Sequence, residues 1–99
     1  MMDKTIVTLG RAIEAHGKEL SELELREPTV EDVQRLGYPY TISADGGVRL
    51  EPKVVGGYIA RLAGIPPSSV TKLSIADFQR LQVSVLGFFG MGDGETQPN

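Results

Sequence analysis

The sequence predicts an α+β fold in which a small N-terminal antiparallel β-hairpin is followed by three to four helices. Apolar residues alternate with polar ones up to Arg26, as in strands with one wet face, and follow a helical period from Val30 onward. Pro28 separates the two patterns because proline cannot donate to a strand ladder. The 99 residues fit one domain. We expect that domain over residues 1–89 and a disordered tail over 90–99.

Composition argues against several classes of function. The chain carries a net charge of -3 and has no cysteine, which excludes disulfides and thiolate metal sites. Its bases do not cluster, so no nucleic-acid partner is expected. The apolar runs are far shorter than the roughly 20 residues that span a bilayer, so no membrane association is expected. The start lacks the apolar region of a signal peptide, and we expect a cytoplasmic location with no cofactor or metal.

The first hairpin is predicted from two strand patterns joined by a turn. Lys4–Leu9 is rich in β-branched residues, and Gly10 suggests a bulge after which the strand continues to Ala15. Gly17 lies in the predicted turn, where it supplies a positive φ. The return strand is Leu20–Arg26. Leu23 and Leu25 face one side, and Glu22, Glu24 and Arg26 face the other.

A short capped helix follows Pro28. Thr29 is a favourable N-cap, and Asp32 lies at the capping-box position three residues later. Val30, Val33 and Leu36 are predicted to form one apolar stripe. Gly37 then ends the helix.

Residues 37–51 are the least regular part of the chain. Alternation on both sides of Asp45-Gly46-Gly47 predicts a small hairpin, and an ordered loop that covers the core is the alternative.

The second half predicts helices. One begins at Pro52 and ends at Gly64, although the Gly56-Gly57 pair in its middle costs roughly 1 kcal/mol per glycine relative to alanine. Such a cost suggests a kink or the close approach of another backbone. A helical turn is expected at 67–70, and a last helix at 75–89 with Ser74 as its cap and Asp77 at the capping-box position. Its predicted apolar stripe comprises Ile75, Phe78, Leu81, Val85 and Phe88, widened by Leu86 and Phe89.

No set of residues predicts catalysis. His16 is the only histidine and lies in a predicted turn, which favours a surface position over a catalytic base. Glu22 and Glu24 share a strand face with Arg26, where a solvated charged face is favoured over acid/base chemistry. The acidic turn at Asp45 lacks the spaced acids of a calcium loop. The sequence therefore favours a protein that is not an enzyme.

Two blocks of the sequence resemble a known family. The first is Leu23-x-Leu-Arg-Glu-Pro-Thr, with Asp32 and Leu36 after it, and the second is Ala60-Arg-Leu-Ala-Gly-Ile-Pro-Pro-Ser-Ser-Val70, continued by Leu73, Ala76-Asp77-Phe78 and Gly87-Phe88-Phe89. In this order and at this distance they resemble the tail assembly chaperones of Mu-like and P2-like phages. The resemblance covers residues 5–36 and about 52–89, while 37–51 depart from the pattern.

The resemblance implies a non-enzymatic protein from a phage or prophage tail gene cluster. Proteins of this kind bind helical segments of the tape measure protein in the host cytoplasm until the tail tube polymerises around it, and the mature virion does not retain them. A frameshifted longer form is common in the family and would be a further partner. A structural subunit of the tail tube or baseplate is the alternative function.

The resemblance and the apolar pattern suggest two groups of site residues. The last predicted stripe is wide enough to serve a partner or a second copy of the chain, although filling the core would explain it equally well. We expect partner contacts on the last two helices, at Tyr58, Ile59, Leu62, Phe78, Leu81, Val85 and Phe89. The motif residues have folding roles instead, as strand end, strand stop and helix cap: Leu25, Arg26, Glu27, Pro28, Thr29 and Asp32.

Overall fold

The protein, described here from a computed structural model over residues 4–90, has an α+β fold. Two antiparallel hairpins and four helices make up the described residues, and the first hairpin precedes all the helices, which confirms the predicted class. The elements in chain order are β1 (Thr5–Ala15), β2 (Lys18–Leu25), α1 (Val30–Leu36), β3 (Tyr40–Ile42), β4 (Val48–Leu50), α2 (Pro52–Ala63), α3 (Pro67–Val70) and α4 (Ile75–Phe88). Of the predicted tail, Gly90 lies in a turn and 91–99 fall outside the described residues.

The first hairpin contains the bulge that Gly10 predicts. β1 and β2 pair in register from Thr5 opposite Leu25 to Thr8 opposite Glu22, and the register then shifts before Ile13. His16 and Gly17 form the turn with φ values of 54° and 75°. Two successive positive φ angles match the twist of a tight hairpin.

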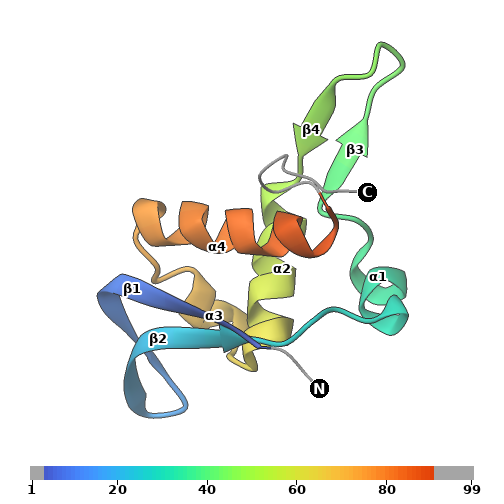
Figure 1. Ribbon diagram of the computed structural model, residues 1–99. Coiled ribbons are helices and arrows are strands. Elements are labelled where there is room, and N and C mark those ends of the chain that lie inside the picture. The colour runs from blue at the N-terminus through green and yellow to red at the C-terminus, as the bar shows by residue number, and fades with distance from the viewer. Residues whose placement is uncertain (1–3, 91–99) are drawn as a thin grey trace.

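The core lies between the inner face of this hairpin and helices α2 and α4. In Figure 1, α4 crosses in front of α2, with the β1–β2 hairpin below α4. The two strands and the two helices contribute alternate and helically spaced apolar side chains, as the sequence predicts. Those that are almost fully buried include Leu23, Leu25, Val55, Tyr58, Ile59, Leu62, Leu81 and Val85.

The predicted helical stripes are wrong at their first residues. Val30 and Ile75, the first residues of α1 and α4, are each 73% exposed. Side chains on a helix lean toward its N-terminus, so the first residue projects beyond the turn that packs on the core. Val33 and Leu36 are half-buried, as are Phe78 and Phe88.

Residues 37–51 form a hairpin, not a covering loop. β3 and β4 pair from Tyr40 opposite Leu50 to Ile42 opposite Val48. Asp45 in the turn accepts the Gly47 amide at 3.0 Å. The hairpin projects away from the helices (Figure 1), and every residue from 41 to 50 is exposed. It therefore contributes little to the core.

The two glycines in the middle of α2 have different surroundings. A Cβ built on Gly57 would lie 3.2 Å from Cδ2 of Leu36 in α1, which is tighter than ordinary van der Waals contact. A Cβ on Gly56 would meet only Cγ1 of Val70, at 3.8 Å, which is ordinary contact. The close packing of α1 on α2 explains Gly57, and packing within the described residues does not explain Gly56.

Candidate functional site

The residues predicted to contact a partner divide into two groups. Five of them are in the core: Tyr58, Ile59, Leu62, Leu81 and Val85, with exposed fractions of 4% or less. Phe78 and Phe89 are half-buried and have surface available to a partner. Partner binding at all seven stays a prediction. Of the seven, only these two phenylalanines present an accessible side chain in the folded chain.

The Leu25–Asp32 motif is built around a buried carboxylate. Asp32 is 1% exposed, and Arg26 donates to its two oxygens at 2.8 and 3.1 Å. The amide of Thr29 donates to it at 2.7 Å, and the Thr29 hydroxyl accepts the Asp32 amide in return, which completes the capping box of α1. Arg61 of α2 also donates to Asp32. The motif therefore ties the end of β2, the start of α1 and the end of α2 together.

The electrostatics of this cluster favour the ionised carboxylate. Hydrogen bonds from the Arg26 guanidinium hold the pKa of Asp32 well below its usual range, against the opposing effect of burial. Arg61 and the Thr29 amide lower that pKa further. The same pairing raises the pKa of Arg26. Leu25 is fully buried, while Glu27 is exposed and its carbonyl accepts from Arg26 at 3.1 Å. Pro28 is half-buried.

A second buried carboxylate joins β1 to the start of α4. Asp77 in the first turn of α4 accepts the amides of Gly10 and Arg11 in β1, at 2.8 and 3.1 Å. These two amides lie in the stretch where the strand register shifts. Hydrogen bonding from Gly10, more than any other contact, lowers the pKa of Asp77. Ser74 caps α4 as predicted, because its hydroxyl accepts the Asp77 amide. The Asp77 carboxylate accepts the two β1 amides instead of the Ser74 amide, so no reciprocal capping box forms.

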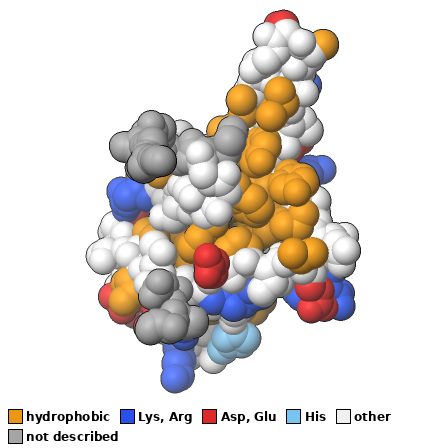
Figure 2. Space-filling view, turned by 45° about the vertical axis from the view of Figure 1, so that its right-hand side comes forward, with side chains coloured by type: hydrophobic (Ala, Val, Ile, Leu, Met, Phe, Trp, Pro, Cys, Tyr) orange, Lys and Arg blue, Asp and Glu red, His pale blue; other side chains and the backbone are white. Residues whose placement is uncertain are grey.

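Aromatic side chains gather where the second hairpin meets α4. We call Tyr38, Tyr40 and Phe89 the aromatic face; their ring centroids lie 5.7 to 6.3 Å apart. Phe89 also stacks edge-on against buried Tyr58, at 5.5 Å. Tyr38 is 56% exposed, and Ile42 and Val48 in the hairpin are 62% and 51% exposed. Figure 2 shows apolar side chains collected at the base of the projecting hairpin and along it. This is a contiguous apolar surface of the kind that marks protein contacts.

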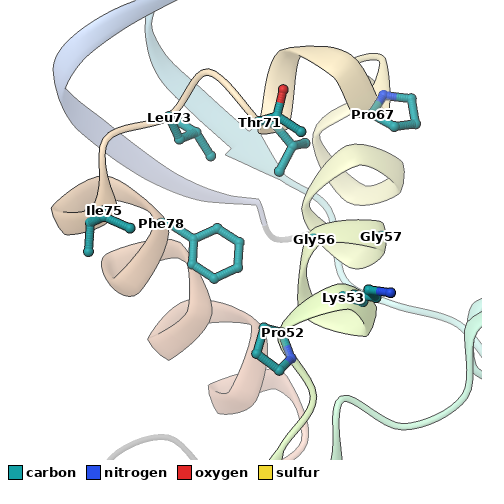
Figure 3. A pocket seen from close by; sticks show the side chains of 10 residues that line it. Pro52, Lys53, Gly56, Gly57, Pro67, Thr71, Leu73, Ile75 and Phe78 are labelled. Carbon is teal, nitrogen blue, oxygen red and sulfur yellow. The ribbon is translucent and has the colours of Figure 1, made fainter.

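A groove lies between α2, α3 and α4. It has a volume of about 460 Å³ (Figure 3). In the figure the ring of Phe78 points from α4 toward Gly56 on α2, and Pro67, Thr71 and Leu73 close the groove from the side of α3. The groove was not predicted from the sequence, although the unfavourable glycine pair in α2 was an available signal.

The polar residues considered for catalysis occupy ordinary surface positions. Nε2 of His16 donates to the carbonyl of Gly64 at 3.0 Å, which joins the β-turn to the end of α2. Glu22 and Glu24 are exposed on β2, and Glu24 pairs with Lys4 at 3.6 Å. Within residues 4–90, no three metal-ligating side chains come together, and no helix is long and apolar enough to span a bilayer.

Sequence reasoning also missed the partners of the buried carboxylates. Asp32 and Asp77 are visible in the sequence as cap residues, but Arg61 and the β1 amides reach them only through the fold. Arg80, which pairs with Asp77 from one turn further along α4, is at a spacing that could have been noted.

Comparison with known proteins agrees with the motifs. No curated protein and no solved structure matches the chain. A family model described as "Phage tail assembly chaperone proteins, E, or 41 or 14" matches residues 6–90. The match covers all four described helices and both hairpins, apart from the first residue of β1. The chain therefore belongs to the phage tail assembly chaperone family.

Proposed function

We propose that this protein is a non-enzymatic chaperone that binds helical segments of a tape measure protein and keeps them soluble until the tail tube assembles. The observation that carries the proposal is the family match over residues 6–90. In this proposal the protein acts in the host-cell cytoplasm and does not remain in the mature virion. A frameshifted longer form of the chain and a second copy of it are further partners.

The surface of the molecule supports this function. A chaperone that holds a long amphipathic partner needs exposed apolar surface, because the partner's apolar stripe must be covered. The aromatic face and the second hairpin supply such surface, with Tyr38, Ile42 and Val48 each more than half exposed. Weak contacts at several such places would add up through multivalency and still allow release.

Co-expression tests the proposal directly. The tape measure protein encoded with this chain should be recovered mainly in the soluble fraction when both are produced together, and mainly in the insoluble fraction when it is produced alone. An unchanged soluble fraction would contradict the proposal.

Purified virions distinguish the alternative function. A structural subunit of the tail tube or baseplate would be present in finished particles in a fixed ratio to the other tail proteins. Under the chaperone proposal, quantitative mass spectrometry of the particles should not detect the chain. Its presence at tube or baseplate stoichiometry would favour the structural role.

A further inference from the structure

We infer that the groove between α2, α3 and α4 binds a helix of the partner whose apolar stripe is flanked by acidic side chains. The inference rests on the proposed function, since it takes the tape measure protein as the source of that helix. It adds a place and a charge preference that family membership does not supply.

The walls of the groove are apolar and come from three elements. The lining residues are Pro52, Lys53, Gly56, Gly57, Pro67, Val70, Thr71, Leu73, Ile75 and Phe78. Ile75 is 73% exposed, and Phe78 and Leu73 are half-buried, so the core leaves part of each side chain unused. An amphipathic helix inserts side chains at i, i+3, i+4 and i+7 into grooves of this shape.

Gly56 lines the groove without a side chain that would fill it. Glycine in the middle of a helix is destabilising relative to alanine. Gly57 is explained by Leu36, which leaves no room for a Cβ at ordinary contact distance, but Gly56 has room for one. Any side chain longer than a methyl group at position 56 would extend toward Val70 and into the groove. An inserted side chain from a partner explains why a glycine stands there.

The segment that forms the groove carries a net positive charge. Between residues 52 and 90 there are four bases and one acid, Asp77, which is buried. Arg61 pairs with Asp32 and Arg80 pairs with Asp77, whereas Lys53 and Lys72 form no ion pair within residues 4–90.

Both of these lysines border the groove. Lys53 is on the rim, with its side chain directed away from the centre in Figure 3, and Lys72 stands between two lining residues, Thr71 and Leu73. Glu51, the nearest preceding acid, accepts from Thr41 in β3 at 3.5 Å. Two lysines are too few to follow a phosphate backbone, but they suit acidic residues beside an apolar stripe.

Peptide binding tests the charge preference. Amphipathic segments of the tape measure protein with acidic flanks are synthesised in two forms, one natural and one with each flanking Asp or Glu changed to Lys. Fluorescence anisotropy with the full chain should show at least tenfold weaker binding of the Lys form, which corresponds to about 1.4 kcal/mol. The double variant Lys53→Glu, Lys72→Glu should reverse the preference. Equal binding of the two forms by the unaltered chain would overturn the inference.

Filling the groove tests its location. Gly56→Leu should weaken the natural peptide at least tenfold. Gly87→Leu is the matched control, because Gly87 is exposed on α4 and a Cβ there meets nothing within 4 Å. Lys18→Glu, in the first hairpin, is the control for the charge change. Circular dichroism confirms that each variant is folded, and the charge variants provide the answer if Gly56→Leu does not fold.

The outcomes separate the two proposals. If the unaltered chain fails to keep the tape measure protein soluble, the proposed function fails. If it succeeds and Gly56→Leu and the double lysine variant succeed equally well, the proposed function stands and the groove is not the binding site.

Discussion

Replacement of Asp32 by asparagine should destabilise the fold far more than its position in a short helix suggests. The carboxylate is 1% exposed and accepts hydrogen bonds from Arg26, Thr29 and Arg61. Breaking a buried ion pair costs about 3–5 kcal/mol when the remaining charge stays buried. The Arg26 and Arg61 side chains are 39% and 35% exposed, so water recovers part of that cost. We expect a loss of about 3 kcal/mol in the free energy of unfolding.

Urea denaturation followed by circular dichroism measures this loss. In a domain of this size, about 3 kcal/mol corresponds to a fall in Tm of roughly 12–24 °C. Glu31→Gln is the matched control, because Glu31 is the neighbouring acid in the same helical turn and pairs with Arg35 at 3.4 Å on the surface. Its effect should stay within about 0.5 kcal/mol. Equal losses for the two variants would refute the assignment of Asp32 as the centre of the cluster.

The effect should also depend on pH. The pKa of Asp32 is lowered in the folded state, chiefly by Arg26, and is about 3.9 in the unfolded chain. Asp32 therefore contributes its full stability above that unfolded pKa, and the contribution is lost as pH falls toward the folded pKa. The difference in unfolding free energy between the unaltered chain and Asp32→Asn should be constant near neutrality and shrink below about pH 4. A difference that stays constant down to pH 3 would assign the effect to packing instead of charge.

Three further changes test other contacts. Asp77→Ala should speed hydrogen exchange of the Gly10 amide, because that amide loses its acceptor at 2.8 Å; unchanged exchange would contradict the role of Asp77 at the bulge. Gly56→Ala should raise the free energy of unfolding by about 1 kcal/mol, and Gly57→Ala should raise it less, because its Cβ would crowd the leucine of α1 at 3.2 Å. A larger gain at Gly57 in urea denaturation would count against this packing. Tyr58→Phe should cost about 1 kcal/mol, because its hydroxyl donates to a backbone carbonyl at 2.6 Å; a neutral result in the same assay would show that water replaces this bond.

Local signals in the sequence predict most of the elements. Thr29 and Ser74 cap helices, Gly64 ends one in the left-handed conformation, and Gly10 lies in the irregular stretch of β1. Each of these features depends on residues within a few positions, so propensity and spacing are sufficient to find it.

Features that depend on distant residues were not predictable in this way. The alternation of the second hairpin predicts its strands but not that every residue from 41 to 50 is exposed. The partner residues are predicted from apolar stripes, and a stripe does not distinguish side chains that meet another helix of the same chain from side chains that meet a partner. The structure places Tyr58 and Leu81 in the core, while accessible apolar side chains lie in the groove beside Gly56 and on the aromatic face at Tyr38.

The hydrogen bonds from Gly10 and Arg11 to Asp77 bear on how this chain is made. They connect residues 67 and 66 positions apart, near the two ends of the described range. The β1–β2 hairpin is local and is complete in sequence by Leu25, but its bulge has no carboxylate acceptor until Asp77 has left the ribosome. Until α4 is made, the nascent chain therefore exposes the part of the hairpin's apolar face that packs against α4. A chain interrupted before α4 would keep that surface exposed, which makes it a substrate for cellular chaperones and proteases.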